Sequence, residues 1–218
     1  MLPRFSSALS AKSAVPPKKL RLGTLVPHHQ RVVVRPVDLV ASGSMNQPDP
    51  LQFIFNRRST RVFKPGKVSE ATITQLLQAA MAAPSAVAQD PWRFVVVQSP
   101  ETRAVLAPEL SNGGMLNSAA LCITVCADLT AAHDQQLSYA LQDCSAAIEN
   151  LLLAATALGL GACWLGVHPR ENRMARLREL LALPAQILPV ACLAIGHPGE
   201  EKSPRTRFNP DHVHWEKW

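Results

Sequence analysis

The segment 139–158 constrains the fold of this chain most strongly, because it has helical character and is rich in Ala and Leu on nearly every face after Asn150. A helix that is apolar all round is normally buried in a core or in a subunit interface. Gly159 and Gly161 end the segment, and the strand-like run 162–167 (ACWLGV) follows directly. We therefore predict a central helix that leads into a buried strand.

Helical and strand-like segments alternate along the chain from Pro48 onward. Further helices are predicted at 50–58, 69–83, 100–110 and 170–182, the second of them capped by Ser69. Runs of β-branched and apolar residues predict the other strands at 93–98, 121–127 and 190–196. This pattern indicates an α+β fold in which helices surround a sheet of about four or five strands.

The first 45 residues differ in composition from the rest and predict a separate region. Residues 1–44 hold seven Lys or Arg and one acid, Asp38, so they account for all of the net charge of +6. The remainder is neutral, which argues against a nucleic-acid partner for the folded part. Three interpretations stay open for residues 1–45: a disordered extension, a transit peptide, or an over-long start with Met45 as initiator.

The apolar runs and the cysteines exclude several other classes. The uncharged runs 151–167 and 180–196 are shorter than the ~20 residues of a spanning helix, and we expect no membrane segment. The five cysteines include no CxxC pair and lie in apolar surroundings, as expected of free thiols in a reducing cytoplasm. His212 and His214 lack a third candidate ligand nearby, so we expect no metal site.

The stretch RRSTR, residues 57–61, places three arginines and two hydroxyl side chains together. A short basic cluster is most often a solvated helix end, but the arginine fork also suits phosphate oxygens. Three further motifs follow in order: PSAVAQDPWRFVVV at 84–97, LGLGACWLG at 158–166 and PRTRF at 204–208. In this order and spacing the chain, from about residue 46 to 218, resembles the nitroreductase family of FMN-dependent oxidoreductases.

The resemblance implies an FMN site built from several segments. Arg57, Arg58 and Ser59 match the phosphate and ribityl contacts of the family, and Arg61 matches a basic position beside the flavin pyrimidine. Arg205 and Arg207 match the basic pair that closes over the phosphate. The family's loop from the partner subunit corresponds to Pro84, Ser85 and Ala86, and the turn whose N–H faces flavin N5 corresponds to Leu165 and Gly166.

The chain also departs from the family pattern on the far side of the flavin. Many relatives carry Asn and Gln where this chain has Ala88 and Asp90. Asp90 can accept a hydrogen bond from flavin N3–H, but a carboxylate there would disfavour the anionic reduced flavin. Trp92 and His168 are candidates for the substrate pocket, with core packing or an ordinary loop role as the alternatives.

The resemblance implies a domain-interlocked homodimer with a mostly antiparallel sheet and FMN at the interface. It implies ping-pong transfer of hydride from NADH or NADPH, through flavin N5, to a nitroaromatic, quinone or similar acceptor, with no catalytic side chain. Two alternatives stay open. One keeps the fold and changes the chemistry to dehydrogenation, dehalogenation or flavin fragmentation, and the other is a weakly catalytic flavin-binding protein.

Overall fold

A five-stranded sheet forms the centre of the structure, and all of its strand pairs are antiparallel. A computed structural model describes residues 49–218, so the expectation for residues 1–45 lies outside the described part. The strands are β1 (Phe63–Lys64), β2 (Trp92–Val97), β3 (Leu121–Asp128), β4 (Gly161–Gly166) and β5 (Ile187–Pro198). The order is β1-β5-β3-β2, and β4 also pairs with β5.

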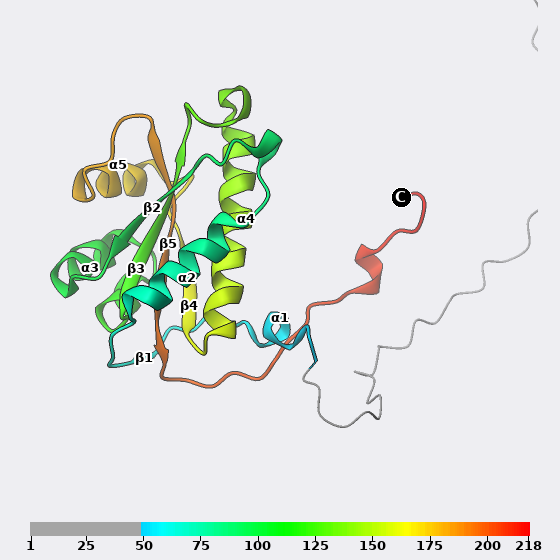
Figure 1. Cartoon of the computed structure of the whole chain (residues 1–218), viewed down its shortest axis with the longest axis horizontal. Coiled ribbons are helices and arrows are strands. Elements are labelled where there is room, and N and C mark those ends of the chain that lie inside the picture. Colours follow the sequence, from blue (N-terminus) through cyan, green and yellow to red (C-terminus); the bar gives the residue numbers. More distant parts are fainter. Residues whose placement is uncertain (1–48) are drawn as a thin grey trace, which may run out of the picture. The chain divides into compact units, whose positions relative to one another are not determined.

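Helices cover both faces of this sheet. They are α1 (Gln52–Asn56), α2 (Glu70–Met81), α3 (Pro100–Leu106), α4 (Leu137–Ala157) and α5 (Glu171–Leu180), with short 3-10 turns between them. Figure 1 shows α2 and α4 on one side of the sheet and α3 and α5 on the other. The α+β class and the predicted helices and strands are confirmed, while β1, with two residues, is too short for a sequence pattern.

Each face of the sheet carries its own hydrophobic core, because successive side chains along a strand point to opposite faces. On β3, Leu121 and Ile123 point into the core under α2 and α4, whereas Cys122 points into the core under α3 and α5. On β5, Leu193 belongs to the first core and Cys192 to the second. Both faces of the central strands are therefore buried.

Local signals in the sequence set the helix ends. The Ser69 hydroxyl accepts a hydrogen bond from the Thr72 N–H at 3.1 Å and begins α2, as predicted. Gly159 has φ +72°, a left-handed conformation that glycine adopts without a Cβ penalty, and it ends α4. Within residues 49–218, no helix is both long and apolar enough to cross a membrane.

The cysteines are free and buried, as expected from their apolar surroundings. Burial raises the pKa of Cys126 and of Cys144 to about 12. These two thiols are therefore protonated at neutral pH and act as small apolar side chains.

Candidate functional site

Four arginines from distant parts of the chain line one cavity of about 300 Å³. They are Arg57, Arg58, Arg205 and Arg207. The first two directly follow α1, and the other two lie in the tail after β5, which runs past α1 (Figure 1). The Arg205 N–H donates to the Phe55 carbonyl at 3.1 Å, and the Arg58 guanidinium donates to the Ser203 carbonyl. We call this cavity the arginine pocket.

The positive charges of the arginine pocket are only partly balanced. Among residues 49–218, Glu149 on α4 is the one acid in its lining, and its carboxylate lies 3.1 Å from Arg57 Nε. The pKa of Arg205 lies below its ordinary value, chiefly because Arg207 repels its charge and further because the two arginines after α1 do so. Four guanidinium groups with one carboxylate favour a bound anion. A phosphate group, with two charges and oxygens that match the arginine fork, fits this donor set.

The sheet positions the RRSTR segment through a short parallel bridge between Ser59 and Ala162 of β4. The Thr60 N–H donates to the Ala162 carbonyl at 3.0 Å, and the Thr60 side chain is buried. A Cβ at Gly161 would lie 2.6 Å from Thr60 Cγ2, so the close approach of the two segments requires glycine there. The edge of the sheet thus fixes the backbone beside the arginine pocket.

Arg61 lies next to a second group of charges at the start of the tail. Its backbone N–H donates to Glu200 Oε1 at 2.7 Å. Lys202 Nζ donates to the same oxygen at 2.7 Å and to the Ser59 carbonyl at 2.7 Å. The hydrogen bond from Lys202 is the main cause that lowers the pKa of Glu200. These contacts hold the tail against the RRSTR segment.

The two residues expected to form a turn at flavin N5, Leu165 and Gly166, are the last residues of strand β4 and pair with β5. Leu165 is buried, whereas Gly166 is exposed and a Cβ there would meet no atom within 4 Å. Gly166 is four residues beyond Ala162, roughly 13 Å along an extended strand. The arginine pocket and an open glycine therefore flank the two ends of one strand. This spacing suits a cofactor with a phosphate at one end and a ring system at the other.

The loop after α2, residues 84–90, is held together by hydrogen bonds between its own residues. The Ser85 hydroxyl donates to Asp90 Oδ1 at 2.5 Å, and the Asp90 N–H donates back to Ser85 Oγ at 3.0 Å. The Ala86 N–H donates to Asp143 of α4 at 2.9 Å. Val87 and Ala88 have φ of +52° and +53°, a strained region for residues with a Cβ. Neither Pro84 nor any other residue of the loop lines the arginine pocket.

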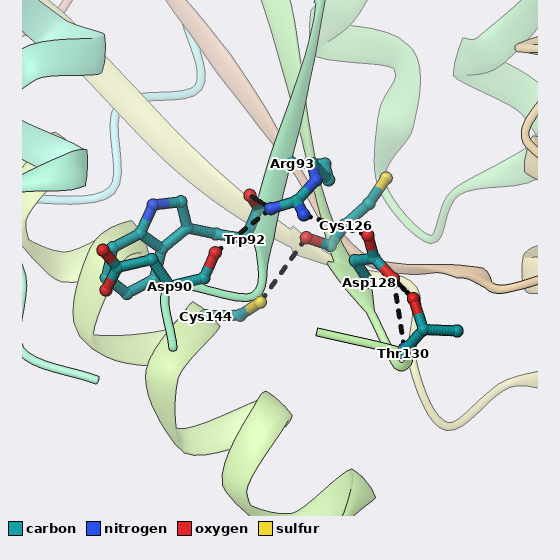
Figure 2. A network of polar contacts seen from close by, with 7 residues as sticks. All are labelled: Asp90, Trp92, Arg93, Cys126, Asp128, Thr130 and Cys144. Atoms are coloured by element: carbon teal, nitrogen blue, oxygen red, sulfur yellow. Dashed lines mark hydrogen bonds and ion pairs between the residues drawn. The ribbon is translucent and has the colours of Figure 1, made fainter. Parts of the chain in front are cut away.

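Arg93 fixes the end of this loop to the sheet, as Figure 2 shows. Its guanidinium donates to the carbonyls of Asp90 and Trp92 at 3.1 and 2.8 Å, and it pairs with Asp128 at 2.9 Å. Asp128 also accepts a hydrogen bond from the Thr130 hydroxyl at 2.7 Å. The network connects the loop to the ends of β2 and β3.

The two candidates for a substrate pocket lie in different environments. Trp92 is 5% exposed and packs in the core under α2 and α4, which favours the packing role. His168 is half-buried two residues after the end of β4, and its backbone N–H donates to the Val190 carbonyl at 3.1 Å. His168 thus follows the open glycine by two residues, whereas Trp92 is a core residue.

Sequence reasoning missed three residues that position the site. Glu149 pairs with Arg57, Asp143 holds the loop, and Lys202 holds the tail. The first two are isolated acids on a helix otherwise rich in Ala and Leu, which is a visible signal. Asp143 is 5% exposed, and its Oδ2 has no hydrogen-bond partner among residues 49–218.

Comparison with known proteins gives consistent matches over most of the described residues. The model of the nitroreductase family matches residues 54–114 and 107–197. A protein of Archaeoglobus fulgidus, provisionally named NADH dehydrogenase/NAD(P)H nitroreductase, is 44% identical over 171 residues, which cover 77% of this chain and 98% of the relative.

Solved structures match over a similar range. A protein of the same provisional name from Parabacteroides distasonis has a TM-score of 0.73 and 35% identity, and the match covers 77% of this chain and 98% of the other. A provisionally named nitroreductase from Desulfovibrio desulfuricans, solved in complex with FMN, has a TM-score of 0.70 and 34% identity, with 79% and 99% covered. The family match includes the first arginines, the loop and β4.

Proposed function

The chain belongs to the nitroreductase family, and we propose that it is an FMN-dependent oxidoreductase that uses NADH or NADPH as reductant. The arginine pocket is the observation that carries this proposal, because it joins four guanidinium groups from two segments around one cavity. Relatives named as FMN reductases, and a related structure in complex with FMN, support the choice of cofactor.

The residues of the arginine pocket hold the FMN phosphate in this proposal. Arg57, Arg58, Arg205 and Arg207 donate to the phosphate oxygens, and Ser59 lies at the start of the ribityl chain. Their mutual repulsion, which lowers the pKa of Arg205, is relieved when the phosphate binds. The binding free energy thus contains both new hydrogen bonds and relief of repulsion within the protein.

The other end of β4 holds the ring system. Bound FMN would supply the redox chemistry, which is transfer of hydride from NAD(P)H, through N5, to a nitroaromatic, quinone or similar acceptor in a ping-pong order. Gly166, exposed and without a side chain, would let the ring approach the backbone at Leu165 and Gly166, the last two residues of β4, closely. Arg61 provides a cation on the pyrimidine side, where negative charge develops on reduction.

We also propose that the active protein is a homodimer with FMN at the interface. None of the residues of α1 is buried, and Leu51, Phe53 and Ile54 are between 38% and 50% exposed. Apolar side chains of the tail, among them Trp215 at 80%, are exposed as well. The loop that the resemblance assigns to the flavin does not line the arginine pocket of its own chain. A second copy would cover the apolar residues and bring a loop to each pocket.

The proposal is tested with purified protein. Its absorption spectrum is recorded after FMN is added and free flavin is removed, and then during anaerobic addition of NADH or NADPH. We expect one bound flavin per chain that is bleached by at least one nucleotide and reoxidised by a quinone or a nitroaromatic. Protein that stays colourless contradicts the cofactor assignment. Bound FMN that neither nucleotide reduces would instead favour one of the alternative chemistries.

A further inference from the structure

A second cavity, of about 670 Å³, shares no lining residue with the arginine pocket. It lies between β1, the segment before α2, the start of α3 and the segment 117–120 before β3. In Figure 1, α3 stands on the other side of the sheet from α1 and the tail. A volume of this order is typical of sites for small organic ligands.

The charged side chains that line this cavity are both positive. In the described part of the chain, its lining contains Arg103 and Lys67 but no Asp or Glu. The nearby Glu101 carboxylate accepts a hydrogen bond from the Ser99 hydroxyl at 2.7 Å and does not line the cavity. An anion inside the cavity would therefore meet two cations, while Glu101, whose charge still acts on Arg103, lies outside the lining.

Arg103 is a charged residue that the fold buries without an ion-pair partner. It is 6% exposed, and it forms no salt bridge with an acid of the described part of the chain. Its Nε donates to the Leu116 carbonyl at 3.1 Å, and its Nη1 donates to the carbonyls of Gln98 and Ala120. Burial lowers the pKa of Arg103, which means that the charged guanidinium is destabilised by loss of water and only partly stabilised by the backbone carbonyls.

One nitrogen of Arg103 is left over from this arrangement. Within residues 49–218, Nη2 has no hydrogen-bond partner, and the atom is not fully buried. Arg103 lines the cavity and Nη2 is not fully buried, so a ligand in the cavity is the partner that this nitrogen can take. The carbonyl contacts fix the guanidinium, so Nη2 is a pre-oriented donor.

The remaining walls combine apolar and neutral polar groups. Phe63 and Val68 are buried and contribute apolar surface, while Asn117 and Ser118 are exposed and carry an amide and a hydroxyl. Such a lining favours a ligand with an apolar body as well as an anionic group.

We propose that this cavity binds a small organic anion, whose carboxylate or phosphate group accepts hydrogen bonds from Arg103 and Lys67 while its apolar body packs against Phe63 and Val68. The site is separate from the arginine pocket and does not depend on the FMN assignment. Arg103 thereby has two roles, because Nε and Nη1 bond three backbone carbonyls on two segments and Nη2 binds the ligand.

The test is isothermal titration of the full chain, in saturating FMN so that the arginine pocket is occupied. Benzoate and AMP serve as probes, one a carboxylate and one a phosphate ester, with inorganic phosphate as the anion without an apolar body. We expect saturable binding of benzoate or AMP and weaker binding of inorganic phosphate. Absence of saturable binding by both organic probes would overturn the proposal.

Charge reversal locates the binding site. Lys67→Glu adds a carboxylate to the lining at an exposed position and should weaken binding roughly tenfold or more, about 1.4 kcal/mol. Asn117→Asp should act in the same direction. Lys64→Glu is the matched control, because Lys64 is exposed and close in sequence but does not line the cavity. If Lys64→Glu weakens binding as much as Lys67→Glu, general electrostatics explain the binding and the site is refuted.

Discussion

Replacing Gly161 with Ala tests how the sheet positions the arginine pocket. The new Cβ would lie 2.6, 2.8 and 2.9 Å from the Cγ2, Cβ and Oγ1 atoms of Thr60. Rotation of the threonine side chain exchanges Cγ2 and Oγ1 but leaves its Cβ in place. The backbone must therefore move, and the bridge between Ser59 and Ala162 must lengthen.

The expected cost follows from overpacking at a buried contact. Inserted methyl groups in packed sites cost about 1–3 kcal/mol, and the lower entropy of the unfolded Ala chain returns about 0.4–1 kcal/mol. A net loss of about 1–2 kcal/mol lowers the melting temperature by roughly 2–8 °C in a domain of this size. Because Ser59 moves with the bridge, FMN affinity should also fall about tenfold, or about 1.4 kcal/mol.

Thermal unfolding of the flavin-free protein and fluorescence titration with FMN measure these two effects. Gly114→Ala is the matched control, since a Cβ at Gly114 meets no atom within 4 Å and its φ is not positive. The control should retain the FMN affinity, and its melting temperature should rise by roughly 1–4 °C, because the entropy gain of about 0.4–1 kcal/mol acts there without a clash. A Gly161→Ala protein as stable as the wild type, with unchanged FMN affinity, would refute the positioning role of the bridge.

Three further predictions concern the loop after α2 and its support. Asp90→Gln should raise the flavin midpoint potential by removing a carboxylate that disfavours the reduced flavin, and an unchanged or lower value in spectroelectrochemistry would contradict this. Arg93→Gln should cost at most about 1 kcal/mol of stability, because the Arg93–Asp128 pair is partly exposed. It should nevertheless accelerate hydrogen exchange of the Ala88 amide, because Arg93 connects the loop to the sheet. Unchanged exchange at Ala88 would contradict this role of Arg93. The pKa of Asp128 is lowered, first by the hydrogen bond from the Thr130 hydroxyl. The ionised Asp128 carboxylate therefore stabilises the folded protein above about pH 4, and this stabilisation is lost as the pH falls through the folded pKa. The stability difference between wild type and Asp128→Asn, measured by urea unfolding, should therefore shrink in acid, and a constant difference would contradict it.

The sequence alone predicts most of the fold because its local signals are strong. The Ser69 cap, the helix end at Gly159 and the apolar character of the long helix are properties of short segments, and the structure confirms them. The two-residue strand β1 has no period of its own. Its pairing with β5 depends on tertiary contacts, which explains why no pattern predicts it.

The candidate site is only partly predictable for the same reason. RRSTR alone is compatible with a solvated helix end, and only the resemblance links it to Arg205 and Arg207. Glu149, Asp143 and Lys202 act through contacts with segments at least 57 residues away, so spacing cannot identify them. The burial of Arg103 is likewise invisible in the sequence, because a short helix with one arginine normally exposes it.

A direct comparison of FMN with riboflavin tests the central claim, that the arginine pocket binds the phosphate of the cofactor. The two flavins share the ring system and the ribityl chain and differ in the phosphate alone. Several charge-assisted hydrogen bonds to the phosphate should make FMN bind roughly 100-fold more tightly or better, about 2.7 kcal/mol. Fluorescence titration of the flavin-free protein with each ligand gives this ratio. Equal affinities for FMN and riboflavin would contradict the account.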